Sequence, residues 1–230
     1  MKQRFPTLSL VLLSFVLVTI ASSRLVAEQQ HDDKITTPAR SVDGQVLSST
    51  GMPSVAIEFD EEFKYAGTQS FVLYDVANCE QHFFVDADDK GRVKGLYWIQ
   101  FEGYLPDNTK SYNYKVTKTV NIGGLDFIAD AYARTTVGST GNPNSDGNRA
   151  RAFLESKGFD VADHIMSQRL VHLIGEDKRN ELMIIYSEEI TSRGLTAADV
   201  SEGGRAFIYW DDLAKGLLDR ALKNMKLTQK

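Results

Sequence analysis

Residues 97–106 read YWIQFEGYLP and place four aromatic rings within eight positions of the chain. In a β-strand, successive side chains point to opposite faces of the sheet, so alternate residues share a face. One face then carries Tyr97, Ile99, Phe101 and Gly103, and the other carries Leu96, Trp98, Gln100 and Glu102. The first face is apolar and is expected to lie in a core. The second passes from apolar to polar, which fits either ordinary packing that reaches water or the mouth of a cavity.

Other segments around this stretch also predict strands, because they are rich in β-branched and aromatic residues and are bounded by turn residues. They are residues 68–76, 79–87, 111–120 and 125–134, and a buried strand at 181–190. DDKG at 88–91 and PDNT at 106–109 supply the turns. Sequential strands joined by short turns predict an antiparallel, meander-like sheet.

The second half of the chain predicts helices. One helix is expected over 150–158 with Ser145 or Asp146 as its cap, and another over 160–175 from its apolar spacing. Thr196 is expected to cap a short helical turn, and a long amphipathic helix is expected over 205–226. The fold class is therefore α+β: an antiparallel sheet covered on one face by helices, including a long C-terminal helix.

The N-terminus has the three-part pattern of a secretory signal: Lys2 and Arg4, then an apolar run from Leu8 to Ala21, then small residues. Cleavage after Ala21, Ser23 or Ala27 is compatible with this pattern, and Ala27 is favoured; an uncleaved membrane anchor is the alternative. The domain prediction is a signal peptide at 1–27, a flexible arm at 28–52 and a single α+β domain at 53–230. We expect an exported protein, periplasmic or secreted, without stable membrane insertion after cleavage.

Charge and cysteine content limit the kinds of partner and the covalent cross-links that the sequence allows. The whole chain has a formal charge of −5, and loss of residues 1–27 removes three basic residues and no acidic one. A more acidic mature protein repels nucleic acid, so no nucleic-acid partner is expected. Cys79 is the only cysteine, so no intramolecular disulfide can form, and it is expected to be a small buried apolar residue.

No motif in the chain identifies a family, a metal site, a cofactor or a catalytic nucleophile. The stretch 86–91 starts like a calcium loop, but Lys90 stands where an oxygen ligand is needed. His164 and His172 are too far apart on the expected helix to share a metal. We therefore predict no catalytic residue, no metal and no cofactor.

Two polar sets on expected strands are the candidates for ligand binding. They are Trp98, Gln100 and Glu102 on one strand, and Asp130, Tyr132 and Arg134 on another. If both line one cleft, an arginine–carboxylate pair could orient the polar end of a ligand against aromatic walls. The alternative is a surface ion pair on a solvated face.

Three functions remain compatible with the sequence. The leading hypothesis is a non-enzymatic domain that binds a small, partly apolar ligand between sheet and helices. The alternative is an interaction or assembly protein of the cell envelope that uses the 28–52 arm or a sheet edge, with an unknown protein partner. The second alternative is an enzyme with a site near Glu102 and Arg134, with Asp130 or His82 as further candidates.

Overall fold

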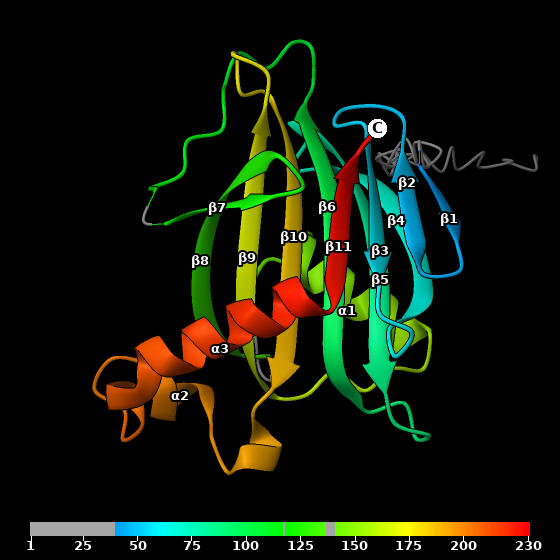
Figure 1. Cartoon of the computed structure of the whole chain (residues 1–230). Coiled ribbons are helices and arrows are strands. Elements are labelled where there is room, and N and C mark those ends of the chain that lie inside the picture. Colours follow the sequence, from blue (N-terminus) through cyan, green and yellow to red (C-terminus); the bar gives the residue numbers. More distant parts are fainter. Residues whose placement is uncertain (1–39, 117, 137–140) are drawn as a thin grey trace, which may run out of the picture. The chain divides into compact units, whose positions relative to one another are not determined.

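Two antiparallel sheets and a few helices make up the protein in a computed structural model, which describes residues 40–116, 118–136 and 141–230 (Figure 1). All of these residues belong to one compact unit, Asp33–Lys230. The larger sheet has seven strands in the spatial order β4 (Lys64–Leu73), β5 (Ala77–Ala87), β6 (Val93–Tyr104), β10 (Asn180–Glu189), β9 (His164–Ile174), β8 (Leu125–Thr135) and β7 (Thr119–Ile122). The predicted α+β class with antiparallel strands is confirmed.

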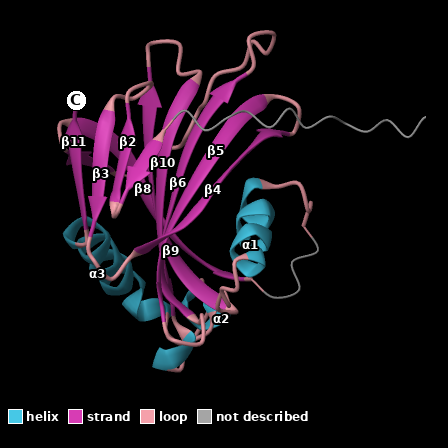
Figure 2. Ribbon diagram, turned by 90° about the vertical axis from the view of Figure 1, so that its right-hand side faces the viewer, coloured by secondary structure: helices cyan, strands magenta, loops and turns pink. Residues whose placement is uncertain are grey.

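A second sheet of four strands was not predicted. Its order is β1 (Ser41–Asp43), β2 (Val46–Ser49), β3 (Val55–Phe59) and β11 (Met225–Gln229). Figure 2 shows this small sheet on one side of the large sheet, with helix α3 (Trp210–Lys223) below it, and helix α1 (Asp146–Ser156) on the opposite side. The short helix α2 (Ala197–Val200) and 3₁₀ turns at Thr191–Arg193 and Phe207–Tyr209 complete the elements.

Alternation along β6 divides the apolar residues into two cores. Tyr97, Ile99 and Phe101 belong to the core between the two sheets, as the sequence predicts. Leu96 and Trp98 belong to the core on the other face, under α1. The large sheet is thus buried on both faces, whereas the sequence analysis expected one covered face.

The C-terminal helix is shorter than predicted, but it packs on the sheet. Helix α3 covers Trp210–Lys223 of the predicted 205–226, and the chain then turns into β11, which pairs with β3. Leu217 and Ala221 lie in the core between the sheets, and the Tyr97 hydroxyl donates a hydrogen bond of 2.7 Å to the Ala221 carbonyl. The small sheet therefore shares the covered face with this helix.

The helix predicted over 160–175 is wrong, because most of this segment is strand β9 (His164–Ile174). It is a central strand with neighbours on both sides, β10 and β8. Leu170 packs into the core between the sheets, and Val171 packs into the core under α1. A strand buried on both faces has no simple two-residue alternation, so its apolar residues also matched helical spacing.

Two further strand and arm predictions need correction. The strand expected over 111–120 forms only near its end, as β7, and the described residues before it form a loop. The predicted flexible arm covers 28–52, yet from Arg40 onward it is folded and supplies β1 and β2. The signal peptide at 1–27 and residues 28–39 lie outside the described part of the chain.

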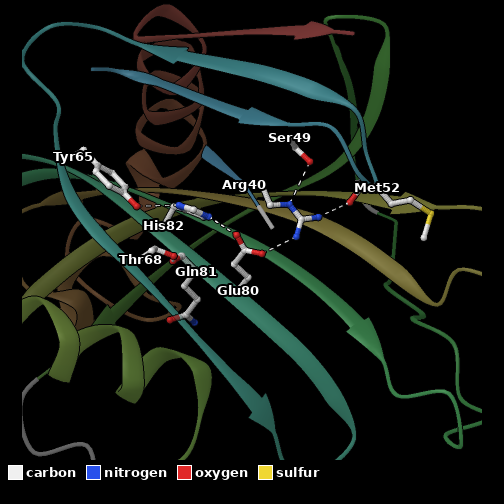
Figure 3. A network of polar contacts seen from close by, with 8 residues as sticks. All are labelled: Arg40, Ser49, Met52, Tyr65, Thr68, Glu80, Gln81 and His82. Atoms are coloured by element: carbon white, nitrogen blue, oxygen red, sulfur yellow. Dashed lines mark hydrogen bonds and ion pairs between the residues drawn. The ribbon is translucent and has the colours of Figure 1, made fainter. Parts of the chain in front are cut away.

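Arg40 connects this N-terminal segment to the large sheet through hydrogen bonds (Figure 3). Its guanidinium donates to Glu80 at 2.7 Å, to the Met52 carbonyl at 3.0 Å and to Ser49 at 3.3 Å. It also lies over the Phe101 ring, 3.9 Å from the centroid. Glu80 in turn contacts His82 at 2.7 Å, so a buried polar network joins the two sheets.

The predicted helix caps are confirmed. The Ser145 side chain accepts a hydrogen bond from the Asn148 amide at the start of α1. Thr196 and Asp199 form a capping box at the start of α2, each side chain bonding the other's backbone amide. Within the described residues, no helix is long and apolar enough to cross a membrane.

Candidate functional site

A cavity of about 380 Å³ lies against the α1 face of the large sheet. Its floor comes from β6, β10, β9 and β8, and its walls come from the start of α1, the loop after β6 and the turn after β4. We call it the Trp98 cavity. Its lining residues are Leu73, Tyr74, Trp98, Glu102, Tyr114, Tyr132, Arg134, Asp146, Gly147, Arg169, Glu181, Met183 and Ile185.

The strand register explains why residues distant in sequence share this floor. Trp98 lies opposite Ile185, which lies opposite Arg169 on the next strand. Four residues further along β6, Glu102 lies opposite Glu181. Directly opposed residues in an antiparallel pair have Cβ atoms roughly 5 Å apart, so the two carboxyl groups are close neighbours on one face.

The loop between β6 and β7 covers the carboxyl pair with two tyrosines. The Tyr112 hydroxyl donates to Glu102 at 2.8 Å, and the Tyr114 hydroxyl donates to Glu181 at 3.0 Å. Arg179 anchors the loop by donating to the Leu105 carbonyl at 2.8 Å. Each carboxyl group therefore has its own tyrosine donor.

Burial changes the protonation of both carboxyl groups. Loss of water contact raises the pKa of Glu181 to about 8, with repulsion from Glu102 as the second cause. Burial also raises the pKa of Glu102, but hydrogen bonds from Tyr112 and Gln100 oppose this shift. Glu181 is therefore the group of the pair that keeps its proton near neutral pH.

Three glutamine side chains form a chain of hydrogen bonds that ends at Glu102. Gln69 donates to Gln81 at 2.7 Å, Gln81 donates to Gln100 at 2.8 Å, and Gln100 donates to Glu102 at 2.6 Å. Gln81 and Gln100 are fully buried. Both oxygens of Glu102 thus accept hydrogen bonds, from Tyr112 and Gln100, and the carboxyl group is fixed in position.

Two residues that line the cavity each carry a buried polar atom without a hydrogen-bond partner among the described residues: Trp98 Nε1 and Glu181 Oε2. Trp98 is 4% exposed and Glu181 is 1% exposed. An unsatisfied buried polar group costs roughly 1–3 kcal/mol, so native proteins keep few of them. Two such atoms on one cavity indicate a place where a ligand can supply the partners.

A smaller hollow of about 110 Å³ adjoins the Trp98 cavity and shares Trp98, Arg134 and Gly147 with it. Its other lining includes Leu96, Leu154 and other apolar side chains from the core under α1. Trp98 thus stands between a polar cavity and an apolar one.

Four of the six predicted site residues line the Trp98 cavity: Trp98, Glu102, Tyr132 and Arg134. Gln100 is not among the lining residues, but it donates a hydrogen bond to Glu102, which is. Asp130 does not pair with Arg134; it pairs with Arg169 through two hydrogen bonds of 3.0 and 2.9 Å. That a ligand binds these residues stays a prediction.

The sequence analysis missed Glu181, Tyr114 and Arg169. Arg169 was assigned to a helix that does not exist. Glu181 opens a strand of apolar residues, and a carboxyl group at that position is a signal that sequence inspection could have used. Tyr114 was placed in a predicted strand rather than in the covering loop.

Other clusters of polar or reactive side chains are weaker candidates for a functional site than the Trp98 cavity. A larger hollow of about 920 Å³ is lined by Glu188, among others, but this carboxyl group already accepts from Tyr186, Arg193 and Arg220. Cys79 is buried, as predicted, and burial raises the pKa of its thiol. Among the described residues, no group of three or more potential ligand side chains is placed to hold a metal ion.

Comparison with protein-family models, with curated proteins and with solved structures gave no match for this chain. The functional argument therefore depends on the geometry of the Trp98 cavity.

Proposed function

We propose that this protein binds a small, partly apolar ligand in the Trp98 cavity, as an exported protein without catalytic activity. The observation that carries the proposal is that two lining residues, Trp98 and Glu181, each hold a buried polar atom, Nε1 and Oε2, that has no hydrogen-bond partner within the described part of the chain. A ligand that bonds to both would offset their desolvation cost.

The Trp98 cavity offers a small molecule both apolar surface and polar groups, and it is more polar than most sites of this kind. Such sites are concave, mainly apolar, and carry a few polar groups that fix the ligand's orientation. Here Ile185, Met183 and the Trp98 indole supply the apolar floor, and Glu181 and Arg134 supply polar groups. The adjoining apolar hollow gives room for a nonpolar extension of the ligand.

Trp98→Phe tests the proposal, because it removes the indole N–H and keeps an aromatic ring. A thermal-shift screen with small neutral aromatic compounds should find molecules that raise the melting temperature of the wild-type protein. We expect Trp98→Phe to reduce that stabilisation by at least half, since one hydrogen bond of about 1 kcal/mol is lost.

Trp210→Phe is the matched control, because Trp210 begins α3 and does not line the cavity. It should respond to the same compounds as the wild-type protein does. Compounds that stabilise Trp98→Phe and the wild-type protein equally would contradict binding at this cavity.

An interaction or assembly protein is the alternative, and one surface feature favours it. Phe207, Ile208 and Tyr209 are consecutive and are 41%, 83% and 61% exposed. Exposed apolar groups of this kind occur at protein contacts. If Ile208→Asp leaves a concentration-dependent increase in molecular mass unchanged, this surface is not the contact.

An enzyme with its site near Glu102 and Arg134 is the second alternative. The opposed carboxyl groups of Glu102 and Glu181 favour it, because two carboxyl groups with different protonation can serve as acid and base. Turnover of a compound that binds the cavity, lost in Glu102→Gln, would replace the binding proposal with this one.

A further inference from the structure

The chemical class of the ligand follows from the two unpartnered atoms, if the Trp98 cavity is the binding site proposed above. The Trp98 indole nitrogen can only donate a hydrogen bond. Glu181 Oε1 accepts from Tyr114, which leaves Oε2 as the oxygen without a donor in the part of the chain that the structure describes. When the carboxyl group is protonated, Oε2 can carry the proton and donate as well.

The groups around Glu181 favour the protonated form. Glu102 lies opposite it on β6, and Asp146 at the start of α1 adds a second negative charge nearby. Arg169 on β9 is the positive group in the same surroundings, but Asp130 already binds it through both guanidinium contacts. On the covering loop, Tyr112 and Tyr114 are neutral donors, and burial raises the pKa of each hydroxyl.

Glu102 has a different role from Glu181. Both of its oxygens accept hydrogen bonds, from Tyr112 and from Gln100. Hydrogen bonds to a carboxylate stabilise its charged form. These hydrogen bonds oppose the rise that burial causes in the pKa of Glu102, whereas Glu181 has only the Tyr114 donor among the described residues, so Glu181 is the carboxyl group of the pair that more readily keeps a proton.

We infer that the Trp98 cavity selects a neutral ligand with hydrogen-bond acceptor oxygens, such as a ketone or an amide, which binds the carboxylic acid of Glu181 in preference to a cation with the same carbon skeleton. The two donors are separated along the sheet. Trp98 and Glu102 are four residues apart on β6, which corresponds to roughly 13 Å of strand. A short ligand with one acceptor bonds to Glu181 alone, and a longer ligand with an acceptor at each end and an apolar middle over Met183 would bond to both donors.

Binding should therefore depend on the proton of Glu181. Because the pKa of this group is about 8, most molecules carry the donor at pH 6 and few carry it at pH 9.5. The affinity for an acceptor ligand falls as the pH rises through this range. A cation would show the opposite trend up to the point where it loses its own charge.

Acetophenone and α-methylbenzylamine test the inference, since they share a carbon skeleton and differ in a carbonyl against an ammonium group. The dissociation constant of each is measured by nuclear magnetic resonance titration of the full chain at about pH 6 and about pH 9.5. We expect acetophenone to bind at the lower pH, to lose affinity by roughly tenfold or more at the higher pH, and to bind more tightly than the amine.

Two variants, Glu181→Gln and Glu181→Leu, distinguish the effect of the titrating proton from the effect of having a hydrogen-bond donor at this position. The glutamine keeps an N–H donor that does not titrate, so acetophenone should bind with little dependence on pH. The leucine has no donor, so binding of acetophenone should be weakened at both pH values. Circular dichroism of each variant checks that it is folded.

The outcomes distinguish this inference from the proposed function. If the affinity for acetophenone does not change with pH, or if the amine binds more tightly, the inference is overturned. The proposal that the cavity binds a ligand would still hold in that case. If neither compound binds at millimolar concentration, the inference is overturned, and the screen with Trp98→Phe decides the proposed function separately.

Discussion

Glu181 is an ionisable residue that is almost completely buried. It is 1% exposed, it lies opposite another carboxyl group, and among the described residues Tyr114 is its one hydrogen-bond donor. The sequence shows Glu181 only as the polar first residue of an apolar strand. Its protonation depends on Glu102, which is 79 positions away and becomes a neighbour only through strand pairing. No local pattern could have predicted that.

The raised pKa of Glu181 makes stability depend on pH. Between about pH 4.5 and about pH 8, the folded protein keeps a proton on Glu181 that the unfolded chain has released. The unfolded state therefore binds fewer protons, and the free energy of unfolding falls as the pH rises, by at most about 1.4 kcal/mol per pH unit from this group. Above about pH 8 this contribution levels off.

Glu181→Gln should flatten that dependence, because the amide does not titrate. Urea unfolding at several pH values between 5 and 9 measures it, and the difference between variant and wild type should grow in favour of the variant as the pH rises. Glu61→Gln, an exposed carboxyl group in a turn, is the control and should keep the wild-type slope. If the free energy of unfolding has the same pH dependence in wild type and Glu181→Gln, Glu181 does not keep a proton in the folded protein.

At the scale of elements, the β6 alternation and the helix caps could be predicted because both depend on neighbours in the sequence. Strand β9 could not, because its residues are buried on two faces and match helical spacing as well as strand spacing. The small sheet was also missed. Its strands are short, and they come from the two ends of the described chain, so their pairing depends on contacts distant in sequence.

The turn between β7 and β8 shows how closely the two sheets approach. Gly123 has a left-handed φ of +59°, and a Cβ atom added there would collide with the Leu227 carbonyl oxygen of β11. The Gln229 side chain also donates to the Gly123 carbonyl at 3.0 Å. This turn is a direct backbone contact between β11 and the large sheet.

Gly123→Ala should lower the free energy of unfolding by roughly 2–4 kcal/mol, from backbone strain and from this collision. Gly44→Ala is a matched control, because Gly44 has a φ of +56° and nothing within 4 Å of its added Cβ. It should cost only roughly 1–2 kcal/mol of strain. Equal losses in urea unfolding would show that β11 does not contact this turn.

At the scale of the whole molecule, the large sheet is a shared wall between two layers with different roles. One face, covered by the small sheet and α3, is a packed core, and the other, under α1, contains the Trp98 cavity. The sequence analysis expected the cleft beneath the C-terminal helix. The Trp98 cavity lies on the opposite face, under α1.

Arg40 joins the layers, so its loss should affect the whole molecule. Arg40→Ala removes three hydrogen bonds and leaves Glu80 buried, with an expected loss of roughly 1–3 kcal/mol of unfolding free energy. Lys94→Ala is the control, since its contact with Asp86 is exposed and 3.6 Å long. Urea unfolding of both variants measures the difference, and a loss no larger than that of Lys94→Ala would contradict the role of Arg40.

The central claim is that a ligand binds beside Trp98, and the chain has only two tryptophans with which to test it. A ¹H–¹⁵N correlation spectrum of the ¹⁵N-labelled protein should therefore show two indole N–H signals, assigned with Trp98→Phe and Trp210→Phe. On titration with acetophenone near pH 6, the account predicts that the Trp98 signal moves and saturates while the Trp210 signal stays in place. A Trp98 signal that does not move, or a Trp210 signal that moves in its place, would contradict it.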